Sequence, residues 1–206
     1  AVAKVLTNLG YAVSRYNDLN EKTFKKALRD FKLQIQGGDE IVFFYAGHGV
    51  QINGANYLLP IDINPENDSA VRDEGIDLKR VLDEFASVQA KVTVAIIDAC
   101  RDNPFKTSSR SSATRGLAAT SAASGQIILF SAGEGQQALD KLGPTDKEPN
   151  GLFTRSLLKY LGQTELSVDQ VARKVRQEVA TMAKGVGREQ VPAIYDQLVG
   201  DFYFSK

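Results

Sequence analysis

The chain has 206 residues, of which 43% are hydrophobic and 24% charged, the length and composition of one globular domain with a substantial core. Its 25 basic and 25 acidic side chains give a formal net charge of zero, which disfavours a nucleic-acid binder because such proteins usually carry a basic excess. No run of residues approaches the roughly 18 apolar residues of a membrane-spanning helix, so we expect neither nucleic acid nor a membrane among the partners.

The first nine residues predict a helix, because their apolar members recur at helical spacing, and Gly10 ends it. Tyr11–Ser14 then predicts a short strand. The chain begins within this helix, without a Met or a capping residue. We therefore expect the first strand of the domain, and any targeting signal, to lie upstream.

A second helix is predicted around Phe24–Ile35, where apolar side chains recur every three or four residues, and Gly37-Gly38 ends it. Ile41–Ala46 is a continuous apolar and aromatic run, as expected for a strand covered on both faces. Asn53-Gly54 lies between two short apolar runs and predicts a hairpin turn, because both residues tolerate positive φ.

Asp77 is predicted to cap a helix that continues to Phe85. Val92–Ile97 predicts a second strand buried on both faces, and Ile127–Ser131 a third. Between them, the segment 103–125 is polar, small and basic. A loop of this length is unusual enough in a compact domain to imply a function.

The last third of the chain predicts two helices and a closing strand. The first helix covers Leu152–Leu161, and Ser167–Gln170 matches a capping box that opens the second, whose valines and Met182 face inward. Leu198–Phe204 is the predicted closing strand. Strands that alternate with helices predict a three-layer α/β/α sandwich with a mainly parallel central sheet.

The only histidine, His48, and the only cysteine, Cys100, each follow a predicted buried strand. In an open parallel sheet, ligands and catalytic groups occupy the crevice outside the carboxyl ends of the strands. A thiolate is a strong nucleophile, and a neighbouring imidazole can take its proton and later give it to a leaving amine. The backbone N–H groups of Gly49 and Cys100 are candidates to stabilise an oxyanion, and glycines on both sides of His48 let a substrate backbone approach closely. The pattern indicates acyl transfer from a peptide bond.

Each of the two residues also has a plain structural interpretation. A lone cysteine after a strand is often a small core residue, and a histidine between two glycines can be a turn residue. Their placement at two equivalent strand ends favours the chemical interpretation. One cysteine and one histidine are an incomplete ligand set for structural zinc, so we predict neither a metal site nor a cofactor.

Two motifs carry a family resemblance. Tyr45–Gly49 and Ile96–Pro104 resemble the corresponding segments of caspase-like cysteine peptidases, and most closely those of the bacterial metacaspase type, the orthocaspases. The histidine lies about 50 residues before the cysteine, a spacing for which caspases are themselves the standard example. Gly151–Thr154, Gln190–Pro192 and Gly200–Phe204 extend the similarity over nearly the whole chain.

The resemblance implies a caspase-like fold and a cysteine endopeptidase, with Cys100 as nucleophile and His48 as general acid and base. Relatives that cleave after Arg or Lys carry an acidic residue two positions before the cysteine, at the floor of the S1 pocket, and Asp98 occupies this position. Ala46 stands in the pocket wall where some relatives have serine.

The expected specificity is for Arg and then Lys before the cleaved bond. A carboxylate at Asp98 suits a guanidinium or ammonium group. Caspases proper prefer Asp and use arginines in S1, and the stretch Ser131–Asp140 contains no arginine. The alternative for Asp98 is a carboxylate satisfied by backbone N–H groups at a strand end. A further S1 acid of the family lies in the segment expected upstream.

The resemblance also implies a division within one peptidase domain, 1–206: a large-subunit-like part (1–105), a linker (106–125) and a small-subunit-like part (126–206). An enzyme specific for basic residues would find substrates in this linker, and exposed loops are where proteolytic nicking concentrates. The candidate self-cleavage positions are Lys106, Arg110 and Arg115. The alternative is a solvated basic loop without processing.

Calcium activates many metacaspases, but the acidic residues between Asp62 and Asp77 lack the spacing of an EF-hand and are expected to form a solvated face. We expect peptide or protein substrates, a monomer, and a cytoplasmic location, because a lone cysteine fits a reducing compartment. The rival from another class is a catalytically silent caspase-like module that binds peptides or proteins; retention of His48 and Cys100 favours the enzyme. A nucleotide-binding domain is a distant third, because no phosphate-binding glycine motif follows any strand.

Overall fold

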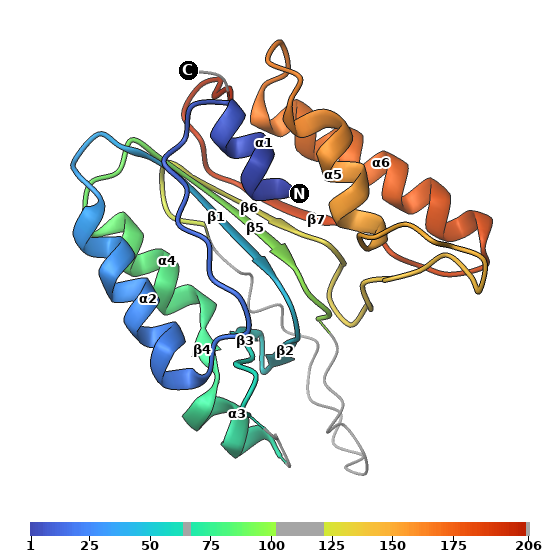
Figure 1. Ribbon diagram of the computed structural model, residues 1–206, viewed down its shortest axis with the longest axis horizontal. Helices are drawn as coiled ribbons and strands as arrows, with labels where there is room; N and C mark the ends of the chain where they lie inside the picture. Colours follow the sequence, from blue (N-terminus) through green and yellow to red (C-terminus); the bar gives the residue numbers. More distant parts are fainter. Residues whose placement is uncertain (64–66, 102–121, 205–206) are drawn as a thin grey trace.

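The computed structural model describes residues 1–63, 67–101 and 122–204. A central sheet lies between two groups of helices, which confirms the predicted α/β/α sandwich (Figure 1). The strand order is β1-β5-β6-β7, in which the first three strands run parallel and β7 runs antiparallel to β6. The bounds of these strands are β1 Glu40–Ala46, β5 Val92–Asp98, β6 Gln126–Phe130 and β7 Ala193–Asp196.

Helices α1, α5 and α6 cover one face of the sheet, and α2 and α4 cover the other (Figure 1). Side chains of β5 alternate between the two resulting cores: Val94 and Ile96 enter the first, and Ala95 and Ile97 the second. The central strand is therefore buried on both faces, as its apolar run predicted. The helices are α1 Val2–Asn8, α2 Glu21–Gln34, α4 Leu78–Ala86, α5 Leu152–Leu161 and α6 Val168–Gly185.

Strand β1 is less covered than its sequence predicted. Within the described residues it pairs only with β5, so it forms an edge of the sheet. Ile41 is buried, but most of its other side chains are half-buried. The apolar run thus predicts the position of the strand correctly, but its side chains are less buried than predicted.

A small antiparallel sheet follows β1 directly. It contains β2 (Gly49–Ile52), β3 (Ala55–Leu58) and the short β4 (Ile76–Asp77). Asn53 and Gly54 have φ values of 51° and 83°, which is the backbone of the predicted hairpin turn. This sheet begins one residue after His48, so its packing bears on the site.

Side-chain caps determine where several helices begin. Asp77 accepts hydrogen bonds from the N–H groups of Lys79 (2.8 Å) and Arg80 (3.3 Å), as predicted. The capping box between Ser167 and Gln170 is present at the start of α6. The sequence analysis missed α3, which covers Asp68–Glu74 and is capped by the preceding asparagine.

Two predicted strands are wrong. Tyr11–Ser14 is irregular, because only the tyrosine is buried and the three following side chains are exposed. Leu198–Phe204 forms no named strand; only Tyr203 makes an isolated bridge, to Ser167. The closing strand is instead β7, where Ala193 lies opposite Phe130 of β6.

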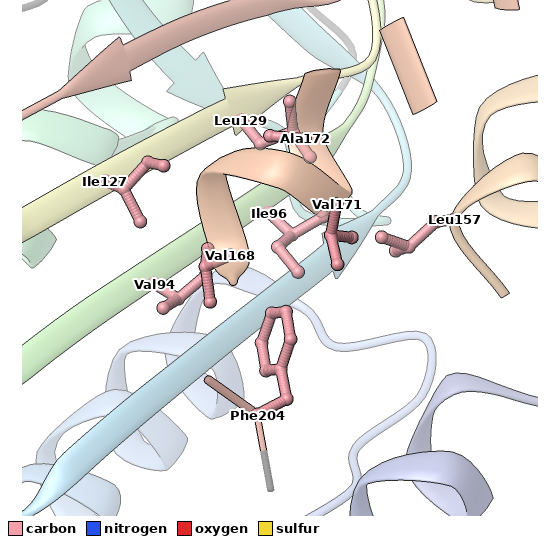
Figure 2. A pocket seen from close by; sticks show the side chains of 9 residues that line it. All are labelled: Val94, Ile96, Ile127, Leu129, Leu157, Val168, Val171, Ala172 and Phe204. Carbon is pink, nitrogen blue, oxygen red and sulfur yellow. The ribbon is translucent and has the colours of Figure 1, made fainter. Parts of the chain in front are cut away.

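The apolar character of the C-terminal tail comes from core packing. Phe202 and Phe204 are buried in the first core, and their rings meet edge to face with centroids 6.2 Å apart. Figure 2 shows Phe204 and the first turn of α6 closing a small space over β5. This cavity of about 10 Å³ is lined by Val94, Ile96, Ile127, Leu129, Leu157, Val168, Val171, Ala172 and Phe204. It offers a water no polar partner and is a packing defect of the core.

We predict that Phe204→Ala lowers the free energy of unfolding by about 3–5 kcal/mol, because it removes a buried ring and enlarges an existing cavity. The matched control is Tyr203→Ala, whose side chain is 41% exposed and which should change stability by no more than about 0.5 kcal/mol. Denaturant unfolding of both variants measures the difference. Equal losses would contradict the role assigned to the tail.

Candidate active site

The site is built where two neighbouring parallel strands end. Ala46, the last residue of β1, lies opposite Asp98, the last residue of β5. The N–H of Gly47 donates to the carbonyl of Asp98 at 3.1 Å, which extends the pairing beyond the strands. Two residues further along each segment come His48 and Cys100. The register therefore carries the only histidine and the only cysteine to equivalent positions at one edge of the sheet.

The backbone of His48 is fixed from two sides. Its carbonyl accepts hydrogen bonds from the hydroxyl of Tyr45 (2.8 Å) and from the N–H of Leu59 (2.9 Å). The same hydroxyl also lies 3.1 Å from the carbonyl oxygen of Leu59. Burial raises the pKa of Tyr45 to about 12, so the phenol stays protonated at working pH. The imidazole is thus carried by an exposed residue with an anchored backbone.

The two glycines beside His48 have a packing reason that differs from the predicted one. A Cβ at Gly47 would lie 2.7 Å from the hydroxyl of Tyr45. A Cβ at Gly49 would lie 2.9 Å from that of Ala99 and 3.1 Å from the carbonyl oxygen of Cys100. Neither site has room for a side chain, because the tyrosine fills one and the end of β5 fills the other. Close packing within the protein therefore favours glycine on both sides of His48.

The segment that carries Cys100 is held on both sides. The hydroxyl of Ser131 accepts a hydrogen bond from the N–H of Ala99 at 3.1 Å. On the other side, the N–H of Arg101 donates to the carbonyl of Gln136, and the carbonyl of Arg101 accepts from the N–H of Gly135, both at 3.1 Å. The half-buried cysteine thus lies between two buried, anchored neighbours.

The N–H of Gly49 takes no part in the pairing of β2 with β3. The bond from Leu59 to the His48 carbonyl makes that pair a hydrogen-bonded one, so the next pair, Gly49 opposite Leu58, is non-hydrogen-bonded. The N–H of Gly49 consequently points away from β3. A Cβ built on Gly49 would lie 3.1 Å from the carbonyl oxygen of Cys100, so the backbones of the two residues are close neighbours.

The carboxyl group of Asp98 has a perturbed pKa. Burial raises the pKa of its carboxyl, and the nearby charge of Asp140 adds to this, while hydrogen bonds from Thr154 and Ser131 lower it. The hydroxyl of Thr154 donates to Oδ2 of Asp98 at 2.5 Å. The backbone N–H of Thr154, in the first turn of α5, also bonds the carboxyl. Asp98 thus caps α5, whose N-cap residue makes no side-chain hydrogen bond. This contact corresponds to the alternative interpretation of Asp98 as a carboxylate satisfied by backbone N–H groups.

Ala46 and Asp98 share one face of the sheet, since opposed residues of paired strands point the same way. The loop that follows β6 borders this region and is held by two glutamines. Gln190, 1% exposed, donates to the carbonyl of Ser131 (2.8 Å) and accepts from the N–H of Leu139 (2.9 Å). Gln136 accepts from two backbone N–H groups with its amide oxygen.

The sequence analysis gave no role to several residues that organise this edge: Tyr45, Arg101, Ser131, Gln136 and Thr154. Their contacts join segments far apart in the chain, which no local pattern reveals. Gln190 was noted only as part of a supporting motif. The candidate self-cleavage positions, Lys106, Arg110 and Arg115, lie outside the described residues.

The described residues contain neither a cluster of metal ligands nor a membrane-spanning helix. In the ranges 1–63, 67–101 and 122–204, no group of three or more His, Cys, Asp or Glu side chains is arranged to hold a metal ion. In the same ranges, no helix is both long and apolar enough to span a bilayer.

A mixed α/β sandwich with these two strand ends is the architecture of the caspase class. The family model of the caspase domain matches residues 1–203, almost the full length of the chain. The chain therefore belongs to the caspase-domain family of cysteine peptidases, which confirms the resemblance to caspase-like peptidases. No curated protein matches the chain.

We predict that Tyr45→Phe lowers kcat/KM roughly tenfold, because the His48 carbonyl loses one of its two hydrogen bonds, which allows the imidazole to shift, and a 1 Å misplacement can cost about a hundredfold. Stability should fall by about 0.5–1.5 kcal/mol, since one hydrogen bond from the hydroxyl is lost while the ring still stacks on Phe24. Tyr16→Phe, at a tyrosine that is 49% exposed, is the control. Peptide hydrolysis and thermal unfolding of both variants provide the measurement; unchanged kcat/KM in Tyr45→Phe would refute the anchoring role.

Proposed function

We propose that the chain is a metacaspase-type cysteine endopeptidase that cleaves after Arg, and less well after Lys, with Cys100 as nucleophile and His48 as general acid and base. The observation that carries this proposal is the β1–β5 register, because His48 and Cys100 each follow the last paired residue of their strand by two positions. The chain also belongs to the caspase-domain family.

The proposed reaction uses groups already located at the strand ends. His48 takes the proton of the Cys100 thiol, and the thiolate attacks the carbonyl carbon of the substrate. The N–H groups of Gly49 and Cys100 stabilise the resulting oxyanion. The imidazolium then gives its proton to the leaving amine as the C–N bond breaks, which leaves a thioester. Water, deprotonated by His48, hydrolyses the thioester and restores the thiol.

Specificity for a basic residue is proposed to come from Asp98, with Ala46 beside it in the pocket wall. Thr154 holds one carboxylate oxygen in place, which fixes the orientation of the carboxyl group. Burial disfavours the ionised carboxylate in the empty pocket. A guanidinium supplied by the substrate would compensate for this cost through a charge-assisted pair. Capping α5 and binding the substrate are thus compatible roles.

The proposed specificity for basic residues also leads to an expectation for the linker, residues 106–125. We propose that 1–105 and 126–206 correspond to the large and small subunits, and that the active enzyme cuts itself after Lys106, Arg110 or Arg115. We also propose a monomer in a reducing compartment such as the cytoplasm, which agrees with the need for a reduced thiol.

Matched fluorogenic peptides ending in Arg, Lys or Asp test the function. We predict hydrolysis in the order Arg, Lys, Asp, and loss of at least about a thousandfold in Cys100→Ala and in His48→Ala, as for removal of a nucleophile or its base elsewhere. Mass spectrometry of the same preparations should find cuts in the linker only where Cys100 is present. Hydrolysis after Asp would be consistent with the catalytic roles of Cys100 and His48 but would contradict the basic S1 pocket. No hydrolysis at any calcium concentration would favour the catalytically silent binding module.

The raised pKa of Asp98 leads to opposite effects on stability and activity. Because the folded-state pKa lies above that of the unfolded chain, the folded protein holds this proton more tightly, and this group makes stability fall as pH rises between the two values. We therefore predict that Asp98→Asn raises Tm at neutral pH. It should also lower kcat/KM for Arg substrates roughly thirtyfold or more, because the lost charge pair is worth about 2–5 kcal/mol of binding free energy.

The pH profile separates this effect from general damage. In the wild type, KM for an Arg peptide should fall as pH rises through the pKa of Asp98, and this dependence should vanish in Asp98→Asn. Asp83→Asn, an exposed carboxylate on α4, is the control and should change neither property. A wild-type KM that does not vary with pH would contradict the proposal that Asp98 binds the basic side chain of the substrate.

A further inference from the structure

Arg101, directly after the cysteine, is a buried cation without an ion-pair partner among the described residues. Only 3% of its surface is exposed. Its guanidinium carbon lies 4.1 Å from the ring centroid of Phe130 and 5.8 Å from that of Tyr195. Aromatic faces attract cations most strongly where water is excluded, so these rings offset part of the desolvation cost.

The guanidinium also reaches three side chains through separate nitrogens. Nε donates to Oδ1 of Asn56 at 3.4 Å, and Nη1 lies 3.5 Å from the hydroxyl of Tyr195. Nη2 donates to the amide oxygen of Gln51 at 2.9 Å when that amide is oriented to donate to Glu134 as well. Asn56 and Gln51 are themselves buried. The planar fork of arginine suits this divergent set of acceptors, which a lysine would not reproduce.

These contacts join the two segments that carry the catalytic pair. Gln51 and Asn56 belong to the β2–β3 hairpin, which begins at Gly49, the residue after His48. The backbone of Arg101 is at the same time bonded to the loop after β6. One side chain therefore links the cysteine segment to the hairpin whose first residue follows the histidine.

We propose that Arg101 is a positioning residue that sets the placement of His48 relative to Cys100; this inference rests on the proposed function. Stability alone does not explain a charge at this place, because an apolar side chain of similar volume often replaces a buried charge at no cost. A requirement for fixed geometry between two separate segments explains it. Arg101 acts through the hairpin and makes no contact with the reacting atoms.

The test compares Arg101→Met, which keeps the length of the side chain, with Arg101→Lys, which keeps the charge over Phe130. Val175→Ala, a fully buried core residue on the opposite face of the sheet, is the control for lost stability. The expected result for Arg101→Met is a kcat lowered roughly tenfold to a hundredfold with KM changed little, because the geometry of the pair is lost and the pocket is not. Arg101→Lys should recover part of kcat, and Val175→Ala should retain it. A kcat in Arg101→Met equal to that of Val175→Ala would overturn the proposal.

A second readout does not require turnover. Alkylation of Cys100 by iodoacetamide needs only a thiolate, so the rate ratio between each protein and its His48→Ala counterpart reports how well the imidazole reaches the thiol. This ratio should exceed one in the wild type and approach one in Arg101→Met. If Arg101→Met does not fold, Asn56→Leu removes the partner on the hairpin and serves the same comparison.

The outcomes of the alkylation test are distinct. If the folded Arg101 or Asn56 variant has the same alkylation-rate ratio as the wild type, the positioning role is overturned, but the catalytic pair is not. A wild-type ratio of one would overturn the pair and the inference together.

Discussion

The parallel pairing of β1 with β5 is the constraint on which the rest of the site depends. It places Ala46 opposite Asp98, and one hydrogen bond from Gly47 continues the pairing beyond the strand ends. A shift of one residue in this register would turn every side chain of β1 to the other face of the sheet. Burial of β5 between two cores makes such a shift costly. The relation between His48 and Cys100 thus derives from hydrophobic burial some distance from either residue.

Close packing at the strand ends converts this register into a particular local geometry. The absent side chains of Gly47 and Gly49 allow Tyr45 and the end of β5 to fill the space around His48. The hairpin then carries Asn56 toward Arg101, whose backbone is bonded to the loop after β6. Polar contacts between buried groups are directional, so they specify a distance in a way that apolar packing alone does not.

Periodicity and capping chemistry made most elements of the fold predictable. Continuous apolar runs identified the strands that hold the sheet together, and Asn53-Gly54 and Asp77 identified a turn and a cap, because these signals are contained within a few residues. The failures concern segments whose role is decided elsewhere in the chain. The aromatic tail is buried by the core and not by strand pairing, and β7 is a short strand that pairs only with β6 within the described residues.

The same distinction applies to the candidate site. His48 and Cys100 stand out because each is unique and follows an apolar run, whereas Arg101 looks like any surface arginine until Phe130, Tyr195 and the hairpin surround it. Asp98 was assigned by its place before the cysteine, but its bond to Thr154 joins residues 56 positions apart. No pattern within a short window contains such a contact.

These long-range contacts have a consequence for the proposed cut in the linker. Strands β5 and β6 lie on either side of the linker in sequence, yet they pair in parallel from Thr93 opposite Gln126 to Ile97 opposite Phe130. Further bonds cross between the same two parts at the site itself, from Asp98 to Thr154 and from Arg101 to the loop after β6. Separating the parts would expose the centre of both cores and break these buried polar contacts. We therefore expect a chain cut between 106 and 125 to remain one folded unit, with its candidate active site still held by contacts from both parts.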